Sequence, residues 1–193
     1  MENLKNKTEQ LRKIRDEVVE CKKCPLWETR KLPVVGVGSH DAKIMFIGEA
    51  PGATEDATGV PFCGKAGHIL DELLESIGVK REDVYICNVL KCRPPNNRDP
   101  LPIEKITCVP YLKRQIEIIA PKIICTLGNH ATDFIFKEFG LENELKGISR
   151  IHGKVFDLPD LKIVSLYHPA VATYNGGMKA TLLEDIKVLK EFI

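Results

Sequence analysis

Four short apolar runs divide the chain, at residues 43–47, 84–90, 122–127 and 162–167. They lack the alternation of apolar and polar residues found in half-exposed strands, so each is typical of a strand covered on both faces. Between and around them, apolar residues recur at helical spacing in segments 10–20, 65–77, 103–119, 130–139 and 179–192. This alternation predicts an α/β fold in which a mostly parallel sheet of four strands lies between two layers of helices.

Length and composition predict one domain spanning residues 1–193. A chain of 193 residues with 44% apolar content can bury its own core. The loop-like stretch 93–100 is short, and we interpret it as part of a site rather than as a linker. The chain has no run of about 18 apolar residues and begins with a charged segment, so we expect a soluble cytoplasmic protein without membrane contact.

The formal charge is only +1. This value excludes a polycation that wraps nucleic acid along its whole length. Any affinity for DNA must therefore come from local groups of Lys and Arg.

Two short motifs directly follow predicted strands, namely Gly48-Glu49-Ala50-Pro51-Gly52 and His168-Pro169-Ala170. Pro169 disfavours helix at His168 and ends the strand there. The carboxyl ends of parallel strands meet at one edge of a sheet, where α/β proteins bind ligands. We therefore expect Glu49 and His168 to face one crevice, although each motif taken alone is equally typical of an ordinary turn.

Asn88 lies inside the second apolar run. A buried amide without partners costs about 1–3 kcal/mol, so this side chain is either paired with a neighbouring loop or kept for a ligand.

Cysteine spacing predicts a metal site. Two residues separate Cys21 from Cys24, an ordinary spacing for metal ligands, and Cys92 and Cys108 flank the Pro-rich loop. These four thiolates complete a ligand set, whereas Cys63, Cys87 and Cys125 lie in surroundings that suit buried free thiols. Spacing alone leaves zinc and an iron-sulfur cluster both open.

A further motif, Gly59-Val-Pro-Phe-Cys-Gly64-Lys65-Ala66, resembles the phosphate-binding loop of nucleotide hydrolases. Its last position lacks the hydroxyl that binds magnesium, and the motif does not follow a predicted strand. We therefore reject an ATPase.

Taken together, four segments resemble the family 4 uracil-DNA glycosylases over nearly the whole chain: Gly48 to Gly52, Gly59-x-Pro-Phe62-x-Gly-Lys-Ala-Gly67, Asn88 with Lys91-Cys-Arg-Pro-Pro95, and Tyr167-His-Pro-Ala170. The resemblance implies a three-layer α/β/α sandwich around a four-stranded parallel sheet. It also implies a [4Fe-4S] cluster on Cys21, Cys24, Cys92 and Cys108. The implied activity is hydrolysis of the N-glycosidic bond of uracil in single- or double-stranded DNA, within base excision repair.

The resemblance also implies roles for individual residues. Gly48, Glu49 and Ala50 would form one wall of the uracil pocket, with Phe62 stacked on the flipped base. Asn88 would read the pairing edge, and His168 would stabilise negative charge on uracil O2. Apart from the resemblance, Glu49 is the only carboxylate in its turn and is therefore our candidate to orient the attacking water and to stabilise positive character on the sugar.

Further residues are assigned from the chemistry of DNA binding. Glu55 is a candidate to exclude the thymine methyl group. The segment after His168 departs from the family pattern in lacking a leucine and an arginine, so Val171 and Tyr174 are the candidates for the wedge that fills the gap left by the base. The candidate phosphate ligands are Lys91, Arg93, Arg98, Arg150 and Lys154.

Two other functions remain open from the sequence. His152 in Ser149-Arg-Ile-His152-Gly resembles the end of a loop that traps uracil-DNA covalently in related proteins, although Ala50 stands where that group has glutamine. Alternatively, the chain is a nucleic-acid binding module that is stabilised by a metal site and has no catalytic activity. For the glycosylase we expect a monomer acting at the prokaryotic nucleoid, and contact with a replication clamp is a further hypothesis.

Overall fold

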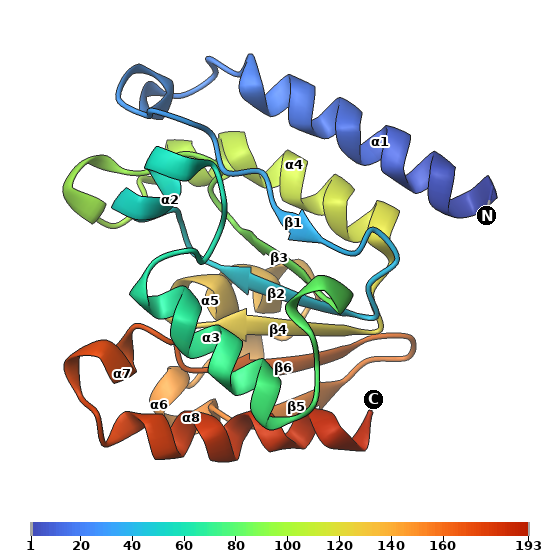
Figure 1. The fold of residues 1–193 in the computed structure, drawn as a ribbon, viewed down its shortest axis with the longest axis vertical. Helices are drawn as coiled ribbons and strands as arrows, with labels where there is room; N and C mark the ends of the chain where they lie inside the picture. Colours follow the sequence, from blue (N-terminus) through green and yellow to red (C-terminus); the bar gives the residue numbers. More distant parts are fainter. Residues whose placement is uncertain (1, 193) are drawn as a thin grey trace.

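The computed structural model describes residues 2–192. Its centre is one six-stranded sheet with the order β1-β3-β2-β4-β6-β5 (Figure 1). The strands are β1 (Val37–Gly38), β2 (Ile44–Gly48), β3 (Tyr85–Asn88), β4 (Ile123–Leu127), β5 (Lys154–Asp157) and β6 (Lys162–Leu166). Strands β3, β2, β4 and β6 pair in parallel, which confirms the four-stranded parallel sheet.

The two edge strands were not predicted. β1 and β5 are antiparallel to their neighbours, so the complete sheet is mixed. β1 has only two residues, and Gly38 in it has φ +124°, which leaves no apolar pattern to detect. β5 is half exposed and pairs with β6 from residue 154 to residue 157.

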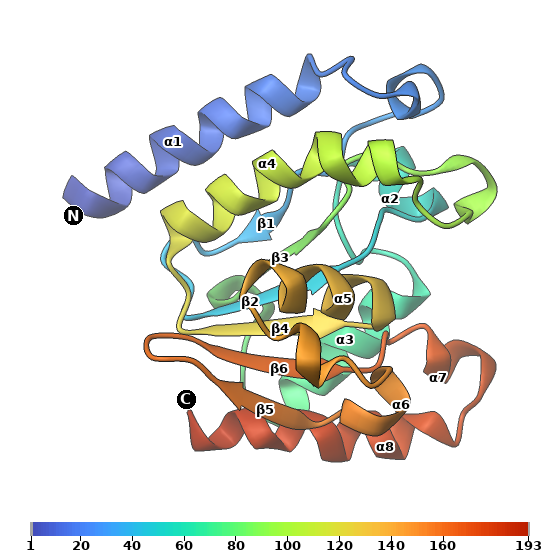
Figure 2. The same ribbon diagram turned by 180° about the vertical axis from the view of Figure 1, so that it is seen from behind.

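Helices cover both faces of the sheet, as predicted. On one face lie α1 (Glu2–Val19), α4 (Pro102–Ile119), α5 (Asn129–Glu138) and α6 (Ile148–Ile151), which Figure 2 brings to the front. On the other lie α3 (Lys65–Ser76) and α8 (Met178–Ile186), in front in Figure 1. Short helices α2 (Ala53–Thr58) and α7 (Val171–Tyr174) stand at the carboxyl ends of the strands.

The continuous apolar runs are explained by burial on both faces. In β2, Met45 and Ile47 pack into the core beneath α1, α4 and α5, whereas Ile44 and Phe46 pack against the side covered by α3 and α8. All five residues of β2 are buried. A strand buried on both faces needs apolar residues at every position, because neither side chain direction leads to water.

Sequence and structure differ in three helical regions. α1 begins eight residues before the predicted start, because only one stripe, including Leu11, Ile14 and Val18, is buried and the first turns are polar. The polar segment 53–58, for which no helix was predicted, forms α2. The last predicted helix ends its α-helical part at Ile186 and continues as a 3-10 turn, Lys187–Glu191.

Within residues 2–192, no helix combines the length and the apolar character needed to cross a bilayer.

Candidate active site

A cavity of about 280 Å³ opens at the carboxyl ends of β2, β3 and β6, the edge toward which β2 and β4 point in Figure 1. It has thirteen lining residues: Glu49, Ala50, Pro51, Gly52, Glu55, Phe62, Ala66, Asn88, Pro94, Asn97, Arg98, His168 and Ala170. The strand-end motifs predicted to converge therefore do converge. Gly48 lies directly behind this lining.

Asn88 ends β3 and is 2% exposed. Its Oδ1 is buried, and among the described residues no donor reaches it. Gly48 makes room for this amide, since a Cβ at position 48 would lie 2.4 Å from Asn88 Oδ1 and 2.7 Å from Phe62 Cζ. A buried acceptor without a protein partner at a cavity wall is ready to take a hydrogen bond from a ligand.

Phe62 is held in a strained backbone conformation, with φ +49°. Such conformations cost about 1–3 kcal/mol and persist only where the surroundings enforce them. Arg81 Nη2 donates to the carbonyl oxygens of Pro61 (2.7 Å) and Phe62 (3.0 Å). Gly67 permits the close approach, because a Cβ there would lie 1.8 Å from Phe62 O. The sequence motifs gave no signal for Arg81.

His168 stands at the end of β6 with its ring stacked on Phe62, the centroids 5.5 Å apart. The Ala170 backbone N–H donates to His168 Nδ1 at 3.2 Å, so a neutral ring carries its proton on Nε2. Burial lowers the pKa of His168 to about 4, against a smaller opposing effect of Glu55. At neutral pH the side chain is therefore an uncharged hydrogen-bond donor.

Glu49 is half-buried at the other side of the cavity. His130 Nε2 lies 3.8 Å from Glu49 Oε2 and 3.7 Å from Asp99 Oδ1, so the imidazole stands between two carboxylates. Burial raises the pKa of Glu49; His130 and Lys105 act to lower it, and Asp99 acts to raise it. Sequence reasoning missed His130, which enters the site from α5 rather than from a strand-end motif.

Glu55 organises the cavity wall. Its carboxylate accepts hydrogen bonds from the backbone N–H groups of Gly52 (3.1 Å), Cys63 (3.1 Å) and Gly64 (3.0 Å). It thereby ties the turn after β2 to the loop that carries Phe62. The structure shows this anchoring; exclusion of the thymine methyl group stays a prediction.

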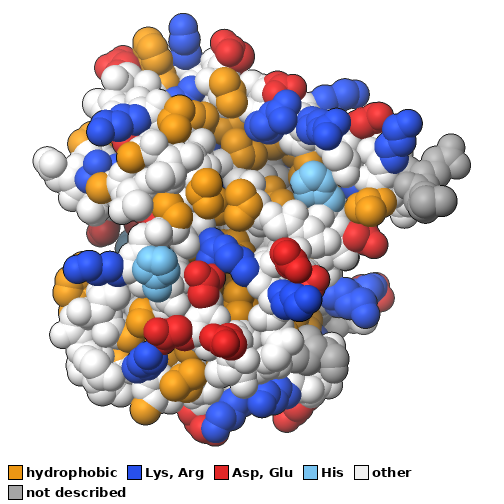
Figure 3. All heavy atoms as spheres, viewed as in Figure 1, with side chains coloured by type: hydrophobic (Ala, Val, Ile, Leu, Met, Phe, Trp, Pro, Cys, Tyr) orange, Lys and Arg blue, Asp and Glu red, His pale blue; other side chains and the backbone are white. Residues whose placement is uncertain are grey.

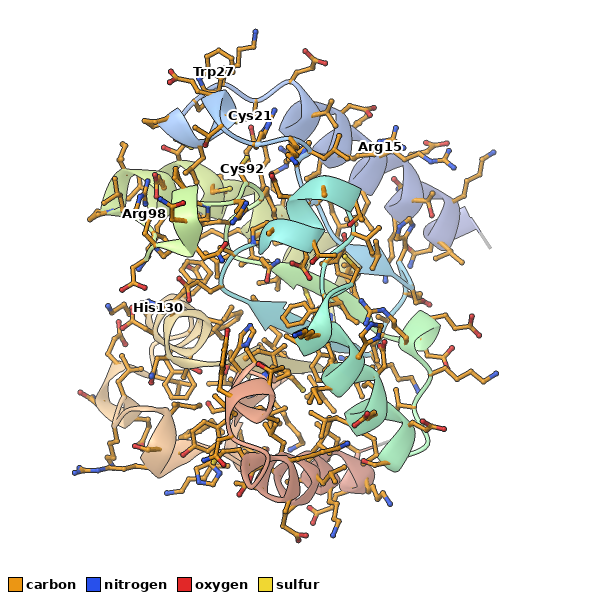
Figure 4. All side chains as sticks on the ribbon, turned by 60° about the vertical axis from the view of Figure 1, so that its left-hand side comes forward. Arg15, Cys21, Trp27, Cys92, Arg98 and His130 are labelled. Atoms are coloured by element: carbon orange, nitrogen blue, oxygen red, sulfur yellow. The ribbon has the colours of Figure 1, made fainter. Side chains whose placement is uncertain are left out.

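The Pro-rich loop forms the outer wall, and its arginines have partners within the protein. Both terminal nitrogens of Arg98 donate to the carboxylate of Glu104, which is 0% exposed, at 2.9 and 2.6 Å. Arg93 Nε donates to Asn97 Oδ1 at 2.8 Å. Arg98 therefore fixes the loop against the start of α4, and Figure 4 shows it on the same side of the molecule as His130.

The prediction that Lys91 binds a DNA phosphate is wrong. The sequence suggested a phosphate ligand, but the side chain is 1% exposed. Its Nζ donates to Asn88 O at 2.8 Å and to Gln115 Oε1 at 2.6 Å. A charge enclosed in this way cannot reach a phosphate on the surface.

The remaining candidate DNA contacts lie outside the cavity lining. Arg150 and Lys154 are exposed, and neither forms an ion pair within residues 2–192. Tyr174 is 91% exposed, whereas Val171 is half-buried. The face in Figure 3 carries Lys and Arg side chains interspersed with acidic ones rather than a single basic patch, in accord with the net charge of +1.

His152 lies outside the cavity lining and has partners of its own. Its Nδ1 is 2.8 Å from Asp185 Oδ2, and its ring lies 4.5 Å from that of Tyr167. It is absent from the cavity lining.

The four cysteines predicted as metal ligands share a second cavity. Its lining includes Cys21, Cys24, Cys92 and Cys108 together with Arg30, Lys91 and Tyr111. Cys21 follows α1 and Cys92 follows β3, yet Figure 4 shows both at the same end of the molecule. The predicted free thiols Cys63, Cys87 and Cys125 are not part of this lining.

Two of the cysteines that line this cavity accept hydrogen bonds at their sulfur atoms. Arg30 Nη1 donates to Cys92 Sγ at 3.1 Å, and the Lys91 backbone N–H donates to Cys108 Sγ at 3.2 Å. Burial raises the pKa of Cys92 and raises that of Cys108 to about 12. Thiols in such a setting ionise when a metal compensates the negative charge.

The segment that resembles a phosphate-binding loop joins two helices. Gly59 ends α2 with φ +75°, and α3 begins at Lys65. The element directly before the motif is the helix α2 and not a strand, so the motif does not have the strand-loop-helix context of a nucleotide hydrolase.

Comparison with known proteins defines the class. Residues 35–190 match the family model described as "Uracil DNA glycosylase superfamily". A type-4 uracil-DNA glycosylase of Sulfurisphaera tokodaii is 49% identical over 186 residues, which cover 94% of this chain and 84% of that relative. Proteins of the same description from Archaeoglobus fulgidus and Thermotoga maritima are 48% and 43% identical, covering 91% and 93% of this chain and 89% and 93% of those relatives. The chain therefore belongs to the type-4 uracil-DNA glycosylases of that superfamily.

Proposed function

We propose that the protein removes uracil from DNA by hydrolysing the N-glycosidic bond, which leaves an abasic site and free uracil for base excision repair. The observation that carries the proposal is the buried, unpartnered Oδ1 of Asn88 at the wall of a cavity that also holds Phe62 and His168. Each of these side chains fits one requirement of the reaction.

Asn88 supplies the selectivity. A base must leave the stack before its glycosidic bond can be reached, and the pocket then reads its pairing edge. Uracil presents a donor at N3 and an acceptor at O4, which match Asn88 Oδ1 and Nδ2. Cytosine presents the reverse pattern and would place donor against donor. Phe62, held by Arg81, offers its ring as the stacking surface for the flipped base.

His168 supplies stabilisation of the leaving group. Cleavage puts negative charge on uracil, mainly at O2, and positive character on the sugar. A neutral imidazole with its proton on Nε2 donates to that oxygen without introducing a charge into the buried pocket. One oriented donor of this kind contributes about 3–4 kcal/mol to the transition state.

Glu49 orients the attacking water and stabilises positive character on the sugar. These roles require the ionised carboxylate, and burial raises its pKa. His130, placed between Glu49 and Asp99, opposes this effect of burial on the pKa of Glu49.

Cys21, Cys24, Cys92 and Cys108 are the ligands of a [4Fe-4S] cluster in this proposal. Zinc, with Zn–S bonds of about 2.3 Å, would hold its sulfur atoms roughly 3.8 Å apart. Among the described residues, the one group of three or more possible ligand atoms within 4.8 Å of each other is Glu49, Asp99 and His130, so the cysteine sulfurs are spaced more widely than a single ion needs. When bound, the cluster would supply structural crosslinking between the end of α1, the loop after β3 and α4.

DNA contacts outside the pocket complete the proposal. Arg93, Arg150 and Lys154 are assigned to phosphates beside the flipped nucleotide, and exposed Tyr174 is preferred over half-buried Val171 as the wedge. A monomeric state and contact with a replication clamp stay predictions.

A base-release assay tests the function. DNA carrying one uracil and an end label is incubated with the protein and treated with alkali to cut abasic sites. Uracil-dependent cleavage should fall by about a hundredfold or more in His168→Ala and Asn88→Ala, whereas Asn143→Ala on the exposed surface should match the parent. Equal binding of uracil and thymine DNA without any cleavage would instead support a binding module.

The covalent-trapping alternative is tested with His152→Ala. His152 is hydrogen-bonded to Asp185 and lies outside the cavity lining, so the His152→Ala variant should still release uracil. A covalent DNA adduct that disappears in this variant would contradict the proposed turnover.

A further inference from the structure

Lys91 poses an electrostatic problem that the proposed catalysis leaves unsolved. Its ammonium is buried, and both of its hydrogen-bond acceptors, Asn88 O and Gln115 Oε1, are uncharged. Among the residues that the structure describes, no carboxylate forms an ion pair with it. A buried charge is costly unless an opposite charge compensates it.

Gln115 does not relieve this problem, because its orientation is fixed. Its Nε2 donates to Val35 O and to Tyr85 Oη, both at 3.0 Å, which directs Oε1 toward Lys91 Nζ. The amide therefore solvates the ammonium but contributes only a dipole. The compensating negative charge must come from elsewhere.

The four-cysteine cavity is the neighbouring source of negative charge. Lys91 belongs to its lining, its backbone N–H donates to Cys108 Sγ, and Cys92 is the next residue. Four thiolates around a divalent ion or a [4Fe-4S] core of the usual charge leave a net charge of about −2. Two positive charges lie beside these thiolates. One is Arg30, which donates a hydrogen bond to Cys92 Sγ, and the other is Lys91.

We propose that Lys91 is the buried counter-charge of the four-cysteine metal site and, through Asn88 O, the positioning residue that couples this site to the uracil-reading amide. Lys91 lines the cavity of the four cysteines, with its backbone N–H on Cys108 Sγ, and its Nζ holds the carbonyl of the residue whose side chain reads the base. The inference rests on the proposed metal site and on the proposed role of Asn88, and its two halves are tested separately.

The first test measures metal retention and needs no DNA. The protein is purified with the metal it carries, and release to a chelator is followed by elemental analysis and visible absorbance. Lys91→Met should release metal about tenfold faster, because a buried charge compensates far more than a solvated one. Lys23→Met is the matched control, since this exposed lysine lies next to Cys24 and should change the rate by less than about twofold.

Gln115→Glu tests whether faster metal release from Lys91→Met comes from the lost charge rather than from a packing defect. It keeps Lys91 and its hydrogen bond but gives the ammonium a carboxylate partner, which withdraws the positive charge from the metal site. Release should therefore accelerate in this variant too, and the reduction potential of a bound cluster should become more negative in both variants. Equal release from the parent, Lys91→Met and Gln115→Glu would overturn the counter-charge role, as would a parent protein that carries no metal on these cysteines.

The second test separates binding from chemistry in molecules that retain metal. Because Lys91 positions Asn88 without touching uracil, metal-loaded Lys91→Met should show KM for uracil DNA raised about fivefold or more, with a smaller change in kcat. Unchanged KM would overturn the coupling to Asn88. A parent protein that retains metal but releases no uracil would refute the proposed function and leave the metal-release result standing on its own.

Discussion

The imidazole of His168 stacks on the ring of Phe62, with centroids 5.5 Å apart and an interplanar angle of 29°. One ring comes from the end of β6 and the other from the loop between α2 and α3. The contact excludes water from one face of the imidazole, and this desolvation disfavours the charged form. The stacking therefore helps to explain why burial lowers the pKa of His168 to about 4.

This pKa predicts a particular dependence of stability on pH. The unfolded chain protonates His168 near pH 6.5 and the folded chain only near pH 4, so acidification between these values favours unfolding. His168→Gln cannot take up this proton. Between pH 7 and pH 4.5 the parent should lose about 2 kcal/mol more of its free energy of unfolding than the variant does. Urea unfolding at both pH values measures the difference, and parallel losses in the two proteins would contradict a His168 that stays neutral in the folded protein.

Gly48 predicts a steric effect on the side-chain amide of Asn88, the residue proposed to read uracil. A methyl group at this position would lie 2.4 Å from Asn88 Oδ1 and 2.7 Å from Phe62 Cζ, so at least one of the two must move. Gly48→Ala should lower the free energy of unfolding by about 1–3 kcal/mol and reduce kcat/KM by about a hundredfold, as expected for misplacement of a group near the reaction. Gly176→Ala is the control, because its methyl group would meet open space. Full activity in Gly48→Ala would show that Asn88 does not need its present position.

Replacement of one of the four cysteines proposed as metal ligands should remove the metal, whereas replacement of a buried cysteine outside that set should not. Cys108→Ala should lose the bound metal and at least about 3 kcal/mol of stability, because metal binding contributes directly to folding. Cys125 is buried too, but it lies in the core beneath α3 and α8. Cys125→Ala should keep its metal and lose only about 1 kcal/mol from the small cavity. Metal analysis and thermal unfolding of both variants decide this, and full metal content in Cys108→Ala would remove this residue from the ligand set.

The sequence predicted the parallel strands well, because burial on both faces leaves a continuous apolar run such as residues 44–47. It missed β1 because this strand has only two residues, Val37 and Gly38, which show no periodicity to detect. It also missed α2, whose polar residues are kept helical by Gly52 at one end and Gly59 at the other. In β1 and α2, tertiary contacts or backbone geometry, rather than the side-chain pattern, determine the structure.

The site was partly predictable for a similar reason. Glu49, Asn88 and His168 follow or end parallel strands, and strand ends share one edge of the sheet, so their convergence was expected. Lys91 was placed wrongly, because a lysine beside a polar loop is usually exposed and the sequence does not show the buried acceptors Asn88 O and Gln115 Oε1. His130 was missed because its approach to Glu49 depends on how α5 is placed against the sheet.

Arg81 is the residue whose role is least visible in the sequence and most directly testable. Its guanidinium donates to Pro61 O and Phe62 O and pairs with Asp71, so it holds the strained φ of Phe62 from outside the cavity. Arg81→Met keeps the aliphatic stem but removes these donors. We expect a loss of about 1–2 kcal/mol of stability, and we expect KM for uracil DNA to rise about tenfold because Phe62 can relax out of its stacking position.

Asp71→Asn provides the matched control for Arg81. This change weakens the ion pair but leaves both carbonyl contacts of Arg81 in place, so KM should stay within about twofold of the parent. Steady-state kinetics on single-stranded uracil DNA avoids any contribution from base-pair opening. If Asp71→Asn raised KM as much as Arg81→Met, the ion pair rather than the two carbonyl contacts would be what holds Phe62. If neither variant changed KM, the strained conformation of Phe62 would not depend on Arg81, and the close packing of Gly67 against Phe62 O would be the remaining constraint.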